Sequence, residues 1–251
     1  MNVKTDMYEL MKGDCLELMK NIPDGSVDMI LTDPPYSTTK NKWDTIIPFE
    51  PLWEQYRRVI KPNGAIVLTA QTPFDKVLGV SNLSMLKYEW IWRKTRPTGH
   101  LNAKRMPMRE HENILVFYKN LPTYNPQGLV KLESPVLRKG RNKGANYGKS
   151  EKDSYRKATG YPRDILEIPS EGKTIHPTQK PVALFEYLIK TYTNEGELVL
   201  DNCMGSGTTA IACMNTQRNF IGFEMDKGYY DIACKRIDDH KEETDDLPTE
   251  N

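Results

Sequence analysis

The sequence predicts an α/β protein with a doubly wound, mostly parallel sheet and an inserted basic region. Three observations lead to this fold class. Short apolar runs rich in strand formers alternate with segments of helical periodicity in both halves of the chain, as at residues 27–31 and 182–192. A glycine-rich loop follows one apolar run and opens a helix near residue 205. Between the two halves, residues 119–175 lose this periodicity and gather basic side chains.

Composition limits the kinds of protein that the chain can be. Its 251 residues, of which 38% are hydrophobic, suffice for one α/β core with an insertion. The net charge of +1 means that any nucleic-acid surface must be a local patch. The four cysteines form no Cys-x-x-Cys pair and match neither a disulfide framework nor a zinc site, which predicts a cytoplasmic protein without a metal. No signal pattern or membrane-spanning apolar run is visible, so no membrane partner is expected.

The first half of the chain is predicted to supply several strands of the sheet. Residues 8–18 form a short strand, a turn at Gly13-Asp14 and the start of a helix. Asp14 then ends a strand, where it can act as a helix N-cap. The elements expected after residue 36 are a helix at 49–60, a turn at 61–64, and strands at 65–70, 89–92 and 111–118.

The apolar run 27–31 organises this half because it ends at Asp33-Pro34-Pro35-Tyr36. Two prolines fix φ and donate no hydrogen bond, so the turn offers acceptors at the carboxyl end of a strand, where open α/β sheets bind ligands. A planar group with an NH2, such as a nucleobase amine, would give its protons to the carboxylate and a carbonyl and be covered by Tyr36. The alternative is an ordinary turn with a buried tyrosine.

The basic segment suggests a nucleic-acid partner. Residues 119–180 carry 13 Lys and Arg against 6 Asp and Glu, with the densest run at 138–144 and tyrosines at 147, 155 and 161. Such cations would neutralise phosphates, while Gly, Asn and Tyr allow adaptable contacts to bases. The segment is therefore either a solvated basic loop or a target-recognition region.

The second half opens with His176-Pro177-Thr178-Gln179-Lys180-Pro181 and a helix at 182–192. A strand at 197–201 then leads into Asn202-Cys203-Met204-Gly205-Ser206-Gly207-Thr208, which opens a helix ending near residue 214. The glycines allow close backbone approach, and the helix N-terminus presents N–H groups to an anion such as the carboxylate of a methionine moiety. Glu224, at the end of a strand at 219–223, can accept from ribose hydroxyls.

The glycine loop also satisfies the dinucleotide fingerprint, which leaves NAD as an alternative ligand. Only 44 residues follow Gly207, enough for one strand and a helix at 229–237 but not for a full dinucleotide domain. The strands that complete the sheet must therefore come from the half that carries Asp33.

Asp33-Pro34-Pro35-Tyr36 resembles the catalytic motif of the amino-group DNA methyltransferases, which methylate adenine N6 or cytosine N4 using S-adenosylmethionine. The hexapeptide from His176 is similar to a motif that precedes the cofactor loop in this family. The order of tetrad, basic insert, hexapeptide and glycine loop resembles a permuted class of the family and covers most of residues 8–237. It implies a Rossmann-like methyltransferase fold with a catalytic half at 1–118, a recognition insert at 119–175, a cofactor half at 176–237 and a disordered acidic tail at 238–251.

The resemblance also implies the roles of individual residues. The catalytic set is Asp33, Pro34, Pro35 and Tyr36. The cofactor-binding set is Asp14, Asp33, His176, Thr178, Lys180, Asp201, Asn202, Cys203, Met204, Gly205, Ser206, Gly207, Thr208 and Glu224. For Asp14, the implied cofactor contact is the alternative to the helix N-cap. One departure concerns the packing around the cofactor, since the family usually has Pro-Phe where this chain has Asn202-Cys203.

The implied reaction is direct methyl transfer to the amine of a flipped base, held by Asp33 and the Pro34 carbonyl. Adenine is expected, because cytosine-N4 members more often carry Ser in place of the acid. The alternatives are cytosine N4, carbon-5 methylation through Cys203, and an inactive DNA-binding protein. The expected partner is DNA, double-stranded and bound through the basic insert, and the oligomeric state is open, a homodimer included.

Overall fold

The computed structural model describes residues 2–37, 44–139, 153–171 and 179–245. Its contacts define two compact units, one of Met1–Asn125 and Asp164–Asn251 and one of Pro126–Arg163. The smaller unit is shorter than the predicted insert at 119–175. The reason is that Asn125 donates to the Thr191 carbonyl at 2.7 Å and that residues from Asp164 onward join the main sheet.

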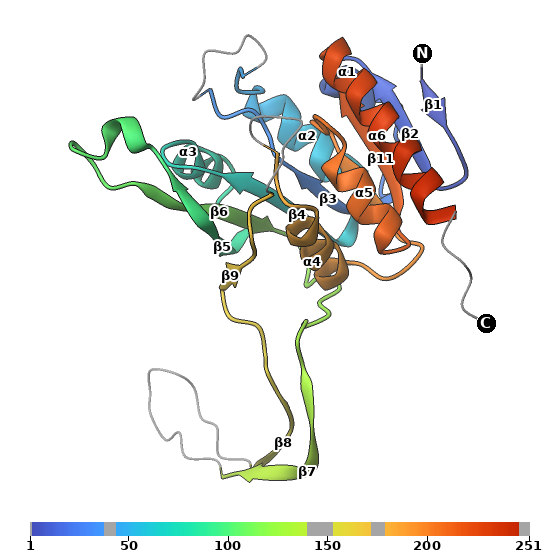
Figure 1. Cartoon of the computed structure of the whole chain (residues 1–251). Helices are drawn as coiled ribbons and strands as arrows, with labels where there is room; N and C mark the ends of the chain where they lie inside the picture. The colour runs from blue at the N-terminus through green and yellow to red at the C-terminus, as the bar shows by residue number, and fades with distance from the viewer. Residues whose placement is uncertain (1, 38–43, 140–152, 172–178, 246–251) are drawn as a thin grey trace. The chain divides into compact units, whose positions relative to one another are not determined.

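The larger unit is built on one mixed sheet, drawn in Figure 1. Within the described residues its strand order is β1-β2-β11-β10-β3-β4-β6-β5-β9. The strands are β1 (Val3–Lys4), β2 (Tyr8–Lys12), β3 (Val27–Thr32), β4 (Ile60–Ala70), β5 (Leu86–Thr98), β6 (Arg109–Phe117), β9 (Ile165–Glu167), β10 (Leu198–Asp201) and β11 (Asn219–Glu224). Pairing is parallel from β2 through β4 and between β5 and β9, and antiparallel elsewhere. The predicted mostly parallel sheet is confirmed.

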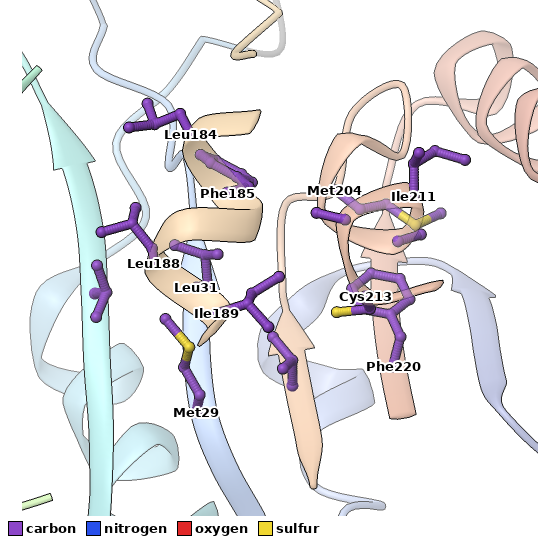
Figure 2. Close-up of a cluster of buried hydrophobic side chains, with 14 of the residues drawn as sticks. Met29, Leu31, Leu184, Phe185, Leu188, Ile189, Met204, Ile211, Cys213 and Phe220 are labelled. Atoms are coloured by element: carbon purple, nitrogen blue, oxygen red, sulfur yellow. The ribbon is translucent and has the colours of Figure 1, made fainter. Parts of the chain in front are cut away.

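Helices cover both faces of this sheet. They are α1 (Cys15–Met19), α2 (Phe49–Val59), α3 (Phe74–Ser81), α4 (Val182–Tyr192), α5 (Thr208–Asn215) and α6 (Lys227–Asp245). Buried side chains of α1, α2 and α3 share one apolar cluster, and those of α4, α5 and α6 share another. The two clusters lie on opposite faces because successive strand residues point to opposite sides, so the doubly wound arrangement follows. Figure 2 shows Leu188 and Ile189 of α4 directed toward Met29 and Leu31 of β3.

The strands of the second half are inserted between those of the first. β10 pairs with β3 through Val199 and Met29, and β11 pairs with β2 through Glu224 and Lys12. Parallel pairing brings the carboxyl ends of β2, β11, β10 and β3 to one edge of the sheet. The loops after these strands therefore meet, although they are far apart in the sequence.

Several elements differ from the prediction. Residues 61–64 were expected to form a turn but belong to β4, where the register shifts between the pairs Val27–Ile60 and Met29–Ala65. The strand expected at 89–92 extends over Leu86–Thr98, because β6 pairs along most of its length. Helix α3 and the short 3-10 helix at His100–Asn102 were not predicted.

The prediction of a disordered tail from residue 238 is wrong for residues 238–245. Helix α6 continues to Asp245, supported by ion pairs such as Lys235–Asp239 at 2.7 Å and by the Lys241 ammonium over the Tyr8 ring. Residues 246–251 lie outside the described part of the chain.

The smaller unit is an antiparallel pair, β7 (Val130–Arg138) and β8 (Ser154–Thr159). Gly128 and Gly160 adopt positive φ, and a Cβ on Gly160 would lie 2.4 Å from the Gly128 carbonyl oxygen, so the strands approach closely at their base. None of the described residues of this unit is buried. The sequence of the unit holds ten Lys and Arg against three Asp and Glu, which gives it an excess of positive charge.

In the described part of the chain, no helix combines the length and apolar character needed to span a membrane.

Candidate active site

A cavity of about 770 Å³ lies at the edge of the sheet where the carboxyl ends of the parallel strands meet. Its wall includes Asp33-Pro34-Pro35-Tyr36 after β3 and the loop from Asn202 to Ser206 after β10. Gly13 and Asp14 follow β2, and Glu224 ends β11, so the ends of β2, β3, β10 and β11 all contribute to the same wall. The Asp33 turn and the glycine loop thus share one cleft, as the sequence required.

Most of the predicted site residues line this cavity. They are Asp14, Asp33, Pro34, Pro35, Tyr36, Lys180, Asp201, Asn202, Cys203, Met204, Gly205, Ser206, Thr208 and Glu224. Gly207 does not line it, since a Cβ at this position would lie 3.2 Å from the Ala233 Cβ. Its φ of +81° and its contact with α6 give it a packing role. His176 and Thr178 lie outside the described residues.

Asp33 accepts hydrogen bonds from three side chains around the cavity. Its Oδ1 accepts from the hydroxyls of Tyr36 and Thr69, which lie 2.9 Å from each other. Its Oδ2 accepts from the Lys180 ammonium at 2.6 Å. A carboxylate has about four acceptor positions, so these three donors leave room for about one more.

Lys180 joins Asp33 to a second carboxylate. Its ammonium, on a side chain only 5% exposed, also lies 3.3 Å from Oε2 of Glu112 on β6. Glu112 Oε1 accepts from Lys94 at 2.8 Å and from the amide of Gln71 at 3.1 Å. Two ammonium groups thus neutralise two carboxylates, which keeps the charges of the buried Lys180, Lys94 and Glu112 compatible with burial.

The pKa values of this group follow from the same contacts. Burial lowers the pKa of Lys180, but the Asp33 and Glu112 carboxylates outweigh it and raise the pKa well above its ordinary value. Burial would raise the pKa of Glu112, yet the Lys180 and Lys94 ammonium groups hold it below normal. Burial, followed by the negative charges of Asp33 and Glu112, raises the pKa of Tyr36 well above its usual range. Lys180 is therefore protonated, Glu112 ionised and Tyr36 neutral near pH 7.

The Tyr36 ring is fixed by aromatic and cationic neighbours. It stacks on Phe74 at a centroid distance of 5.1 Å and an interplanar angle of 25°. The Lys180 ammonium lies over the ring, 5.5 Å from its centroid. The cation thus contacts both the acid and the aromatic ring of the tetrad.

At the other end of the cavity, Asp201 braces the glycine loop. Its carboxylate accepts from the Thr32 hydroxyl at 2.6 Å, from the Thr209 hydroxyl and from the Cys203 N–H at 3.0 Å. Burial raises the pKa of Asp201 to about 6, against the opposing effect of these three donors. The contacts tie β3, the loop and the start of α5 together.

Glu224 accepts hydrogen bonds that fix the glycine loop at Gly205. It accepts from the Gly205 N–H at 2.9 Å and from the Asp226 N–H at 2.8 Å. Burial raises its pKa, while these backbone donors act in the opposite direction. Gly205 has a φ of +51°, a conformation that glycine adopts without strain.

Two residues that replace the family's usual Pro-Phe have their own partners. Asn202 accepts from the Tyr56 hydroxyl at 2.6 Å in the core below the loop. The Cys203 thiol accepts from the Asn202 amide at 3.4 Å and makes a hydrogen bond with the Cys15 thiol. That bond, followed by burial, raises the pKa of Cys203 well above normal, so the thiol is protonated and a poor nucleophile.

Asp14 combines the two alternatives that the sequence left open. Its side chain accepts from the Leu16 N–H at 2.8 Å and caps α1, and it also lines the cavity.

Sequence reasoning missed Glu112, Lys94, Thr69 and Gln71. One signal was present, because Lys94 continues the two-residue alternation of the buried Trp90 and Trp92. A lysine on the inward face of a strand requires a buried partner, and Glu112 is that partner.

The fold and the shared cleft define a class of protein, the Rossmann-like methyltransferases that use S-adenosylmethionine. More narrowly, the model of the N6_N4_Mtase family, described as DNA methylase, matches residues 27–235. The chain belongs to this family of DNA methylases.

Individual relatives agree with this assignment. The chain is 30% identical to the Type II methyltransferase M.BglII of Bacillus subtilis, across 98% of this chain and 73% of the relative. It is 30% identical to the Type II methyltransferase M.HpaI of Haemophilus parainfluenzae, across 91% and 74%. The crystal structure of the M1.HpyAVI–SAM complex matches with a TM-score of 0.63 and 29% identity, across 92% of this chain and 100% of that one. The cytosine-N4-specific PvuII DNA methyltransferase matches with a TM-score of 0.69 and 16% identity, across 95% and 93%, which is a likeness of fold.

Proposed function

We propose that the protein is a site-specific DNA methyltransferase that transfers a methyl group from S-adenosylmethionine to the exocyclic N6 of a flipped adenine. The observation that carries this proposal is the shared cavity. Its wall holds an acidic, aromatic corner at one end and a glycine loop at the other. A donor and an acceptor of the methyl group can therefore lie side by side without water between them.

The glycine-loop end fits S-adenosylmethionine. Helix α5 begins at Gly207 without a side-chain cap, so its N–H groups are available to the carboxylate of the methionine part. Asp14 and Glu224 supply carboxylates for the hydroxyl and amino groups of the nucleoside part. A volume of about 770 Å³ is in the range of cofactor pockets. When bound, the cofactor supplies an electrophilic methyl group on a sulfonium.

The Asp33 end fits the target amine. We assign the Asp33 carboxylate and the Pro34 carbonyl as acceptors for the two amine protons, and the Tyr36 ring as the surface that covers the base. These acceptors draw the nitrogen lone pair out of conjugation with the ring. The nitrogen would form its bond to the methyl carbon as the carbon–sulfur bond breaks and the sulfur keeps the electron pair. The proton that the amine then loses would pass through the Asp33 carboxylate to solvent. Positioning and electrostatic stabilisation carry the catalysis, and no covalent enzyme intermediate is required.

Direct transfer is favoured over a cysteine mechanism by the state of Cys203. Its pKa is raised well above normal, whereas carbon-5 methylation needs a thiolate nucleophile. The thiol also contacts Asn202 and Cys15 at the glycine-loop end of the cavity.

The choice of adenine rests on the acid at the first position of the tetrad. Cytosine-N4 methylation is the alternative that shares the same geometry, because both bases present an NH2 on a planar ring. The Type II relatives also suggest a modification enzyme that protects DNA from a companion nuclease.

DNA is proposed to contact two basic regions. One is the smaller unit, whose exposed cations include Lys131, Arg138 and Lys157. The other is the wall of the cavity itself, which includes Arg96 and Arg109, and Arg109 donates to Gln71 beside Glu112. The cations of both regions can neutralise phosphates. The arginines at the cavity wall would contact the phosphates that flank the extruded nucleotide.

The test is to incubate the protein with genomic DNA and S-adenosylmethionine labelled in the methyl group, then to digest the DNA to nucleosides. The expected product is labelled N6-methyladenine, absent with Asp33→Ala. Labelled N4-methylcytosine would identify cytosine instead of adenine as the target base. Labelled 5-methylcytosine would indicate the cysteine mechanism, with Cys203 as the nucleophile. DNA binding without any labelled base would refute the proposed activity.

A further inference from the structure

The Lys180 ammonium occupies the place that the proposed reaction reserves for the target amine. It donates to Asp33 Oδ2 at 2.6 Å and lies 5.5 Å from the centroid of the Tyr36 ring. A base amine held by Asp33 and covered by Tyr36 would make the same two contacts. Although Asp33 keeps about one free acceptor position, the lysine and the target base therefore compete for Oδ2 and for the space over the Tyr36 ring.

Glu112 offers the lysine another partner. Its Oε1 already accepts from Lys94 and Gln71, whereas its Oε2 pairs with the Lys180 ammonium at 3.3 Å without a well-aligned hydrogen bond. This oxygen is buried. A buried carboxylate oxygen is stabilised by a short, well-aligned hydrogen bond, so a small shift of Lys180 toward Glu112 would strengthen the existing pair.

We propose that Lys180 is a placeholder for the target amine and that Glu112 takes over its ammonium when the base enters, which makes Glu112 a positioning residue. This inference rests on the proposed function. The exchange keeps Lys180 paired with a carboxylate throughout, so no buried charge is left alone. It also frees Asp33 to accept from the amine.

Electrostatics favours this exchange during methyl transfer. The accepting nitrogen becomes positively charged as its bond to the methyl carbon forms, and a cation on the same carboxylate oxygen would oppose that charge. Lys94 supports the exchange because its hydrogen bond to Oε1 leaves Oε2 directed toward Lys180. Arg109 continues this series of hydrogen bonds along the cavity wall, since it donates to Gln71 Oε1 at 3.0 Å and Gln71 donates to Glu112.

The test compares four variants in single-turnover methylation of DNA. Glu112→Gln removes the second carboxylate and should leave Lys180 on Asp33, which lowers the rate by about 10- to 100-fold, the loss of one hydrogen bond to a charged group. Lys180→Met in the Glu112→Gln background removes the placeholder and should restore at least about fivefold of the lost rate. Glu110→Gln is the matched control, because Glu110 is an exposed glutamate on the same strand that pairs with Arg93. Glu112→Asp, whose shorter carboxylate withdraws from Lys180, replaces Glu112→Gln should that variant fail to fold.

A second measurement does not depend on methyl transfer. Wild-type protein should bind oligo(dA), whose bases are not paired, more tightly than an abasic oligonucleotide of the same length. Glu112→Gln should lose this preference but keep its affinity for the abasic strand and for S-adenosylmethionine.

The outcomes separate the two proposals. Glu112→Gln within about twofold of the wild-type rate, or a double variant no faster than Glu112→Gln, would overturn the placeholder. An absent preference for oligo(dA) in the wild type would also overturn it. A wild type that shows this preference and loses it in Glu112→Gln, yet methylates no DNA, would retain the placeholder and refute the proposed reaction.

Discussion

Replacing Asp33 by Asn tests the electrostatic basis of the proposed catalysis. The Lys180 ammonium, 2.6 Å from Asp33 Oδ2, shows that the corner admits a charged nitrogen at hydrogen-bond distance. At that distance and an effective dielectric constant of about 20, a full positive charge interacts with the carboxylate by about 6 kcal/mol. A half-developed charge in the transition state interacts by about 3 kcal/mol. Because about 1.4 kcal/mol corresponds to a factor of ten, the rate of transfer should fall by about 10²- to 10⁴-fold.

The assay is single-turnover methylation with enzyme in excess over DNA, accompanied by the affinities for S-adenosylmethionine and for DNA. The Asn side chain keeps the size of Asp and one acceptor oxygen, and Glu112 remains as a partner for Lys180. Both affinities should therefore stay within about threefold of the wild type, since only the charge is removed. Asp24→Asn serves as the control, because Asp24 is an exposed acid that pairs with Arg58 away from the cavity wall. A rate for Asp33→Asn within tenfold of the wild type would refute the assignment of Asp33 as the charged acceptor.

Three further predictions concern the loop and the DNA surface. Burial raises the pKa of Asp201 from 3.8 to about 6. The free energy of unfolding therefore falls as the pH rises from about 3.8 to 6, and the full loss is reached above pH 6. Relative to the wild type, Asp201→Asn should therefore gain about 1.4 kcal/mol between pH 5 and 7.5 in urea unfolding, and parallel curves would contradict the shift. Glu224→Gln should weaken S-adenosylmethionine binding by about tenfold in calorimetry, and an unchanged affinity would remove Glu224 from the cofactor site. Replacing Lys131, Arg138 and Lys157 by Ser should lower the slope of log affinity against log salt by about one for each phosphate that is no longer neutralised, whereas an unchanged slope would exclude the smaller unit as a DNA surface.

The shared cleft could be predicted because it depends on local patterns and one topological rule. The apolar runs before Asp33 and Asn202 marked two parallel strands, and parallel strands present their carboxyl ends at the same edge. The short chain after Gly207 then required the two halves to share a sheet. The tetrad and the loop could therefore be predicted to lie together because each directly follows the carboxyl end of a parallel strand, although they are far apart in the sequence.

The charged group behind Asp33 could not be predicted in the same way. Glu112 and Lys94 meet through the antiparallel pairing of β5 and β6, and Lys180 reaches them from the loop before α4. Such pairing depends on long-range register, which a single sequence does not fix. The helical extension after residue 237 was missed for a related reason, since the polar face of α6 resembles a solvated tail when its contact with Tyr8 is unknown.

The departure at Asn202-Cys203 changes what holds the glycine loop in place. The Asn202 side chain accepts from the Tyr56 hydroxyl at 2.6 Å, both residues are buried, and Tyr56 belongs to α2 on the face opposite α5. An unpaired buried polar group costs about 1–3 kcal/mol, so the amide and the hydroxyl stabilise the fold only together. The loop is thereby anchored to both layers, through Asn202 to α2 and through Asp201 to Thr209 of α5. A polar anchor in the core thus holds the loop at the two positions where the resemblance implies Pro-Phe, and the loop keeps the positive φ of Gly205 and Gly207.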